Sequence, residues 1–196
     1  MKAFNLRRLV AVTALLGTCN AVATFAPSIV QAKPAAGTKM VGGAAMYPSK
    51  NIIQNAVNSK DHTTLVTAVK AAGLVKTLSG PGPFTVFAPT NAAFAKLPAG
   101  TVPTLLKAEN KKTLVKVLTY HVVAGKYSAS ALLALIKKGG GKAQLTTVQG
   151  EKLTASKMGS KIMLTDAKGG MSHVTIADVN QSNGVIHVVD TVLMPK

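Results

Sequence analysis

A histidine and an aspartate lie three residues apart in the C-terminal stretch SNGVIHVVDTVLMP, which is otherwise almost entirely apolar. An imidazole beside a carboxylate is a common arrangement for general acid–base catalysis. In a β-strand, residues of equal parity share a face, so His187 and Asp190 would point to opposite sides of the sheet. Both sides carry apolar residues, as in a central strand. We therefore expect no catalytic dyad, and we expect these two side chains and Asn183 to find hydrogen-bond partners within the fold.

The sequence contains no common catalytic or nucleotide-binding motif. A G-x-S-x-G nucleophile elbow, a P-loop and an H-E-x-x-H zinc motif are all missing from it. The four histidines, at positions 62, 121, 173 and 187, are far apart, and no carboxylates accompany them at metal-ligand spacing. We therefore predict no catalytic residue, no metal site and no cofactor. A metal or hydrolytic site that is assembled only by the three-dimensional fold is the alternative.

The N-terminus has the layout of a bacterial secretory signal. Three basic residues among the first eight precede the apolar run LVAVTALLG, and small residues follow it. The run is nine residues long, whereas a membrane-spanning helix needs about 20. We predict a signal peptide over residues 1–32, with cleavage after Ala32, or after Ala23 as the alternative. The protein is expected to be secreted, extracellular or periplasmic, or held at the cell surface, with no transmembrane segment.

The single cysteine, Cys19, lies inside this predicted signal peptide. The sequence LLGTC weakly resembles the lipid-attachment box of bacterial lipoproteins, but Thr18 stands where that box requires a small Gly, Ala or Ser. We favour a cysteine that is removed with the leader over a lipid anchor. The mature chain would then have no cysteine, and no disulfide could stabilise the exported domain.

The chain is strongly basic, with 23 Lys and Arg against 6 Asp and Glu. Three of the basic residues belong to the leader, so 20 lysines would remain against the same six acids, a net charge near +14. Such a charge favours anionic partners, namely acidic polysaccharide, phospholipid headgroups or nucleic acid. Without arginine the attraction should be diffuse and sensitive to salt, with no specific nucleic-acid recognition. The alternative is a coat of lysines that only keeps the protein soluble.

The mature chain is predicted to form one domain. Residues 33–46, KPAAGTKMVGGAAM, are rich in Gly and Ala without a usable hydrophobic period, which predicts a flexible N-terminal tail. The domain itself is expected to span residues 47–196. No internal repeat divides it.

Helical periodicity marks the first half of this domain. Apolar residues recur at helical spacing in residues 61–73, 111–120 and 129–138. Gly73 is placed to end the first of these helices, and Asn110 is placed to cap the second. The two lysines that end the third segment suit the negative end of a helix dipole.

The second half changes to the period of β-strands. A first strand is predicted earlier, over residues 84–88, where it leads into a short helix capped by Thr90. Short β-rich runs follow from residue 143 onward, namely AQLTTV, EKLTAS, KIMLTD and HVTIADV. Residues 174–179 and 185–194 are expected to pair as a hairpin around Asn183 and Gly184. Helices followed by antiparallel strands indicate an α+β domain in which helices cover a sheet or small sandwich.

Three segments, in this order and at this spacing, resemble the signature boxes of the fasciclin-like domain family. They are FTVFAPTNAAFAKL, LTYHVVAGKYSASAL and IADVNQSNGVIHVVDTVLMP. The resemblance covers about residues 51–195 of the chain. It implies a wedge-shaped antiparallel β-sandwich flanked by several α-helices. It also implies an exported or surface-held adhesion module without catalytic activity, as in animals, plants and other bacteria.

The resemblance further implies where a partner would bind. In animal members, binding of integrins has been attributed to a Tyr-His box and to an Asp-Ile pair before the last strand. Tyr120 and His121 match the first, and Asp178 matches the second, with Val179 in place of isoleucine. The residues themselves leave a structural role open for the Tyr-His pair, because Tyr and His are often mostly buried with a satisfied polar tip. A protonated His121 would also suit the end of a helix.

The sequence thus predicts a secreted or surface-associated adhesion module that binds cell-surface or extracellular-matrix partners without catalysis. The alternative function is a lysine-rich protein that binds polyanions such as acidic polysaccharide.

Overall fold

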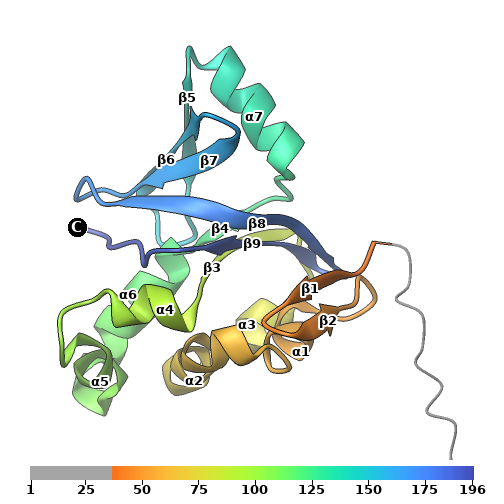
Figure 1. Cartoon of the computed structure of the whole chain (residues 1–196). Coiled ribbons are helices and arrows are strands. Elements are labelled where there is room, and N and C mark those ends of the chain that lie inside the picture. The colour runs from red at the N-terminus through yellow and green to blue at the C-terminus, as the bar shows by residue number, and fades with distance from the viewer. Residues whose placement is uncertain (1–36) are drawn as a thin grey trace, which may run out of the picture. The chain divides into compact units, whose positions relative to one another are not determined.

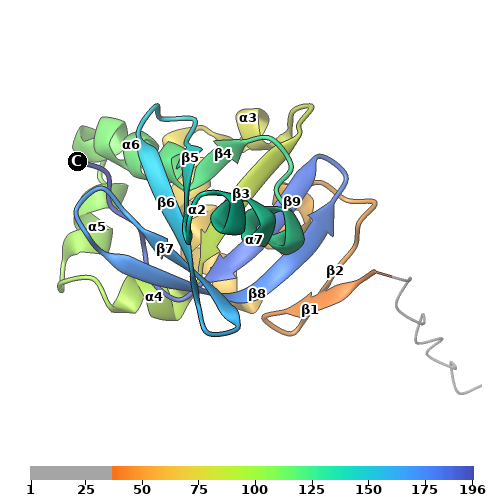
Figure 2. The same cartoon turned by 90° about the horizontal axis from the view of Figure 1, so that it is seen from above.

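A computed structural model describes residues 37–196, and a seven-stranded mixed sheet forms the centre of this part of the chain (Figures 1 and 2). The strand order is β4-β3-β9-β8-β7-β6-β5, and a single bridge between Val123 and Thr147 joins the two ends of the sheet, which makes it barrel-like. The strands are β3 (Phe84–Pro89), β4 (Val122–Ala124), β5 (Lys142–Thr146), β6 (Lys152–Met158), β7 (Lys161–Thr165), β8 (Met171–Gln181) and β9 (Gly184–Val189).

The predicted α+β class is confirmed, with one difference in the sheet. All neighbouring strands pair antiparallel except β3 and β9, which run parallel from Phe84 opposite Gly184 to Pro89 opposite Val189. A sandwich with antiparallel strands alone was expected because the sequence shows only local pairings. The parallel pair arises from a long crossover that returns the chain to the end of the sheet where β3 began.

Strand β8 belongs to both halves of the sheet. Its first residues pair with β7, as in Met163 opposite His173, and its later residues pair with β9. The register shifts twice along β8, once before Ile176 and once between Ile176 and Val179. Such bulges bend a strand and increase its twist, so β8 can pass from one half of the sheet to the other.

The predicted hairpin of β8 and β9 is confirmed, because Gln181 lies opposite Gly184 across the turn at residues 182–183. The second strand is shorter than expected. It ends at Val189 and not at Met194, so Asp190 lies just beyond it. Every residue of β9 is buried, which explains its continuous apolar sequence.

Two hydrophobic clusters share the sheet. Val86 and Ile186 pack towards the helices with Leu65 and Leu118. Phe87 and Val189, on the opposite faces of the same strands, pack with Leu132 and with residues of β6 and β7. The central strands β3 and β9 are therefore buried on both sides.

The predicted helices are confirmed at residues 63–72, 111–120 and 129–138. Gly73 ends the first with a positive φ of 76°, and the Ser128 side chain caps the third by accepting a hydrogen bond from the Ala131 N–H. Helices α1 to α6 lie on one side of the sheet in Figure 1, and α7 lies on the other side against β5 and β6. The helices are α1 (Ile52–Ala56), α2 (Thr63–Ala72), α3 (Val75–Ser79), α4 (Asn91–Ala95), α5 (Thr101–Leu106), α6 (Lys111–Tyr120) and α7 (Ala129–Lys138), with 3-10 turns at Lys60–His62 and Ala108–Asn110.

The expected flexible tail over residues 33–46 is wrong for its second part. Strands β1 (Lys39–Val41) and β2 (Ala44–Met46) form a hairpin that lies beside β8 in both views (Figures 1 and 2). Gly42 and Gly43 provide the turn with positive φ, and Val41 and Met46 are buried against the domain. The segment has the Gly- and Ala-rich composition of a linker, so its Gly-Gly turn and its two buried apolar residues did not predict a hairpin.

The predicted signal peptide over residues 1–32 and its cleavage positions lie outside the described residues. None of the helices between residues 37 and 196 is long and apolar enough to span a bilayer.

Candidate functional site

The Tyr-His box closes the interior of the domain. Tyr120 ends α6 and its side chain is fully buried. Its hydroxyl donates a hydrogen bond to the Lys152 carbonyl at 3.2 Å and accepts one from the Ala167 N–H at 3.0 Å. The tyrosine thereby links α6 to β6 and to the turn that follows β7.

His121 uses both of its ring nitrogens inside the protein. Its Nδ1 lies 2.8 Å from the Val117 carbonyl, to which it donates, and its Nε2 accepts a hydrogen bond from the Leu193 N–H at 3.0 Å. Burial lowers its pKa to about 4, although the Val117 carbonyl and the charge of Asp166 oppose this shift. The imidazole is therefore neutral near pH 7, and the expectation of a protonated His121 at the helix end is wrong.

A partner cannot touch three of the four residues expected to bind it. Tyr120, His121 and Val179 are at most 2% exposed. The expectation of direct contact is wrong for these three, because apolar and aromatic side chains at the ends of α6 and in β8 are needed to fill the core.

Replacing Tyr120 with Phe is expected to lower the free energy of unfolding by about 1–2 kcal/mol. The change removes only the hydroxyl, which leaves the Lys152 carbonyl and the Ala167 N–H without their partner. Urea denaturation measures the effect. Tyr127→Phe is the matched control, since no hydrogen bond of its hydroxyl occurs among the described residues, and an equal loss in both variants would contradict this role of Tyr120.

Asp178 lies in a bulge of β8 with a φ of 55°, which is the one positive φ of a non-glycine residue within residues 37–196. Its carboxylate accepts a hydrogen bond from the Ala129 N–H, the first residue of α7, at 2.6 Å. The side chain is half-buried and already engaged. Asp178 therefore fixes the start of α7, where a negative charge also suits the helix dipole.

His187 completes this connection from the interior. Its Nδ1 accepts a long hydrogen bond, 3.4 Å, from the Asp178 N–H, and its Nε2 donates to the Tyr127 carbonyl at 2.8 Å. The ring also stacks on Phe87, with centroids 5.7 Å apart. Burial lowers the pKa of His187, so the imidazole is neutral. Together, His187 and Asp178 tie β8 and β9 to the segment that leads into α7.

Asp190 is separate from His187 and lies next to another histidine. Its carboxylate accepts hydrogen bonds from the His173 N–H at 2.8 Å and the Thr191 hydroxyl at 3.1 Å, and it lies 3.4 Å from His173 Nδ1. Partial burial raises the pKa of Asp190, but these hydrogen bonds and nearby positive charge outweigh it and lower the pKa. The proximity of His173 and Asp190 was not predicted from the sequence. Cross-strand partners can be counted outward from the β8–β9 turn, but the two bulges in β8 shift the pairing by the time the count reaches these residues.

The Ser172 hydroxyl contacts the Asp190 carboxylate of this pair and not the His173 imidazole. Ser172 is buried, and its hydroxyl lies 3.4 Å from the Asp190 carboxylate and donates to the Thr191 carbonyl at 2.9 Å. Among residues 37–196, no hydroxyl group forms a hydrogen bond with the His173 ring. Within residues 37–196, no group of three or more His, Cys, Asp or Glu side chains could hold a metal ion.

Asn183 connects the β8–β9 turn to two helices. Its side-chain oxygen accepts a hydrogen bond from the Ile52 N–H at 3.1 Å, at the start of α1. Its amide donates to the carbonyls of Leu78 at 2.8 Å and Gly80 at 3.0 Å, at the end of α3. One side chain therefore satisfies three backbone groups from distant segments.

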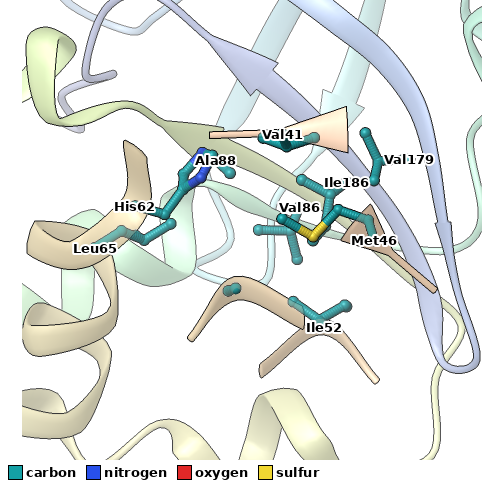
Figure 3. A pocket seen from close by; sticks show the side chains of 10 residues that line it. Val41, Met46, Ile52, His62, Leu65, Val86, Ala88, Val179 and Ile186 are labelled. Carbon is teal, nitrogen blue, oxygen red and sulfur yellow. The ribbon is translucent and has the colours of Figure 1, made fainter. Parts of the chain in front are cut away.

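A small apolar cavity lies beneath the β1–β2 hairpin (Figure 3). Its volume is about 20 Å³, and His62 lines it together with apolar side chains of the hairpin, α1, α2 and the sheet. His62 Nδ1 lies 2.9 Å from the Ser59 hydroxyl, whereas the buried Nε2 has no hydrogen-bond partner of good geometry among the described residues. Burial lowers its pKa, against the influence of the nearby Ala88 carbonyl. A cavity of this size accommodates about one water molecule and no organic ligand.

Five exposed lysines lie where α7, β5 and the β6–β7 turn meet, with Lys142 and Lys161 on the face of the strands opposite to Lys157, and we call this end of the sheet the basic end. Lys142 lies opposite Ser156, two residues before Met158, and Met158 lies opposite Lys161, so strand pairing brings these segments together. A hollow of about 540 Å³ there is lined by Leu133, Ile136, Lys137, Gly140, Gly141 and Lys157. The lysines of the basic end are Lys137, Lys138, Lys142, Lys157 and Lys161.

Among residues 37–196, the acidic residues form no ion pair with these five lysines. Asp166, Asp178, Asp190 and Glu151 all accept hydrogen bonds from backbone N–H groups. In the part of the chain that the structure describes, the Lys116–Glu151 contact at 3.6 Å is the one ion pair of a lysine. Most of the positive charge is therefore free to act on other molecules.

Known proteins are similar to this chain in sequence and in fold. The profile of the family described as Fasciclin domain matches residues 60–195. Protein sll1483 of Synechocystis sp. is 45% identical over 188 residues, which cover 96% of each chain. The cell surface glycolipoprotein MPB83 of Mycobacterium bovis is 37% identical over 164 residues, which cover 81% of this chain and 66% of that protein. A solved FAS1 domain pair from the insect cell adhesion molecule Fasciclin I has a similar fold, with a TM-score of 0.67 at 17% identity over 74% of this chain and 51% of that one.

Proposed function

Because the chain belongs to the fasciclin domain family, we propose that it is a secreted or surface-associated adhesion module, which binds a cell-surface or matrix partner and catalyses no reaction. The names of two similar proteins support this proposal, since one is a cell surface glycolipoprotein and the other an insect cell adhesion molecule. The predicted signal peptide would bring the chain to such a location.

The observation that carries the proposal is the internal use of the polar groups at the motif positions. Tyr120, His121 and His187 direct their polar atoms to backbone groups of the same domain. These side chains are thus parts of a rigid scaffold and are not free to act as acids, bases or nucleophiles. A rigid domain with engaged interior groups is suited to presenting a surface to a partner.

We propose that the partner-binding surface includes the start of α7, which Asp178 and Val179 position from β8. Asp178 is half-exposed and holds the Ala129 N–H, so a change at this residue would move the helix that follows. In this proposal, Tyr120 and His121 support the same surface from below and do not contact the partner.

Binding of the purified secreted protein to envelopes of its source cells tests the proposal. Asp178→Ala should weaken binding about tenfold, or roughly 1.4 kcal/mol, because it removes the hydrogen bond to α7 and places alanine at a positive φ. Asp178→Asn should bind almost as the wild type, since its oxygen can still accept from the Ala129 N–H and Asn tolerates this φ.

The wild type should remain bound in high salt, and protease treatment of the envelopes should abolish binding. Turnover of a substrate without any retention on envelopes would overturn the proposal. Equal losses in both Asp178 variants would show that the charge is contacted and that positioning of α7 is not the cause.

The second candidate function is binding of acidic polysaccharide, and the unpaired lysines favour it. Electrostatic binding should collapse as salt rises through physiological concentrations, because exposed charges are screened beyond about 8 Å. If the protein elutes from a heparin column at a salt concentration well below the one at which adhesion would persist, this second function is identified. A variant with several Lys→Gln changes should then elute early, whereas Asp178→Ala should elute with the wild type.

A further inference from the structure

We infer that the basic end is a docking surface for a membrane that carries anionic phospholipid headgroups, separate from the adhesion surface proposed above. The lysines come from three segments, namely the end of α7, the start of β5 and the β6–β7 turn. All five are exposed, and none of their ammonium groups has a hydrogen bond or ion pair among the described residues. A cluster of exposed lysines attracts anionic lipid, and each lysine near the membrane surface contributes about 1 kcal/mol to the binding free energy.

Acidic residues are scarce around this surface. Asp190 lines a neighbouring hollow together with Lys161, and its negative charge offsets that of this lysine in part. No acidic residue lies within residues 128–161 other than Glu151, which pairs with Lys116 and accepts from the Lys196 N–H. The basic end therefore keeps a positive field that its own domain does not cancel.

Apolar side chains lie among the lysines, and they indicate which anion this surface fits. Leu133, which is half-buried, lines the hollow together with Lys137 and Lys157. Met158 in the β6–β7 region is 58% exposed, and Leu135 on α7 is 37% exposed. An acidic polysaccharide offers no apolar phase to such side chains, whereas the boundary between headgroups and acyl chains does.

The same surface is poorly suited to nucleic acid. It contains neither arginine nor an aromatic side chain at the five lysines, so bases would find no planar group to stack on. Lysine, with its long apolar stem and terminal charge, suits the boundary of a bilayer instead.

Sedimentation with phospholipid vesicles tests this inference on the purified protein. Binding is expected to phosphatidylcholine vesicles that contain phosphatidylglycerol, and not to vesicles of phosphatidylcholine alone. The triple variant Lys137→Gln, Lys157→Gln, Lys161→Gln should lower partitioning about 100-fold, since each lysine contributes about fivefold.

The triple variant Lys70→Gln, Lys111→Gln, Lys112→Gln is the matched control. It removes the same charge from exposed lysines of α2 and α6, on the other side of the sheet, and should lower partitioning only severalfold. Equal losses in the two triple variants would overturn the inference in favour of a diffuse effect of net charge.

Met158→Gln separates a membrane from a polysaccharide. It should weaken binding to anionic vesicles about tenfold, as expected for loss of partial burial of one apolar side chain, and leave retention on heparin unchanged. If vesicle binding is unchanged, or if the protein binds heparin and no vesicles, the surface recognises charge alone and the inference fails. Because Met158 and the lysines are exposed, circular dichroism should show that every variant keeps its fold.

Discussion

Acidification from pH 7 to pH 4 is expected to lower the free energy of unfolding by about 3 kcal/mol through His121 alone. The folded protein holds this imidazole at a pKa of about 4, whereas its ordinary value is 6.5. Above pH 6.5 the imidazole is neutral in both states, and the full stability is present. As the pH falls below 6.5, His121 binds a proton in the unfolded chain but not in the folded chain, so the free energy of unfolding decreases progressively down to about pH 4.

Urea denaturation at several pH values measures this loss, and His121→Gln provides the comparison. The variant should be less stable at pH 7, because Gln cannot keep both hydrogen bonds to Val117 and Leu193 with the same geometry. Its stability should nevertheless fall with acid by about 3 kcal/mol less than that of the wild type. The slope that remains belongs to groups such as His62 and His187, whose pKa values are also lowered by burial. Parallel slopes in the two proteins would show that His121 is not the source.

Replacing Asn183 with Ala is expected to cost about 3 kcal/mol of stability, at roughly 1 kcal/mol for each backbone group left unpaired. The side chain serves the Ile52 N–H and the carbonyls of Leu78 and Gly80. Without it, the turn between β8 and β9 loses its attachment to α1 and α3. The midpoint and slope of urea unfolding give the effect.

Two neighbouring changes sharpen this test. Asn183→Asp keeps an acceptor for the Ile52 N–H but loses both donated hydrogen bonds, so an intermediate loss of about 2 kcal/mol is expected. Ser182→Ala alters an exposed side chain in the same turn and should be nearly neutral. If Ser182→Ala were as harmful as Asn183→Ala, the turn would be sensitive for a reason other than these hydrogen bonds.

Sequence reasoning succeeded where the determining interactions are local. Thr90 caps α4 and Gly73 ends α2 as predicted, because each acts on backbone groups within a few residues. The β8–β9 hairpin was predictable for the same reason. The predicted cap at Asn110 is wrong, since its side chain accepts no hydrogen bond from α6 and donates to the Thr104 carbonyl at 2.9 Å. His187 and Asp190 lie apart, since His187 is in the interior and Asp190 lies at the surface just beyond the end of β9, so strand alternation does not account for their separation.

The features of the fold and of the site that were not predicted depend on contacts between segments that are distant in the sequence. The parallel pairing of β3 with β9 has no local signal, and neither has the proximity of His173 to Asp190. The motif identified Tyr120 and His121, but only the folded chain shows that both are buried and hydrogen-bonded to Lys152, Val117 and Leu193. A short sequence pattern states which residues matter to a family without stating whether they face a partner or the core.

The parallel pair at the centre of the sheet also determines when the chain can fold. Phe84 lies opposite Gly184, one hundred residues further along the chain. A polypeptide that emerges N-terminus first, from a ribosome or through a translocation pore, therefore cannot complete this sheet until almost all of it has emerged. Contacts of such long range slow folding. A chain that folds slowly remains unfolded for longer and can pass through a translocation pore in that state. The topology of the sheet is therefore compatible with export.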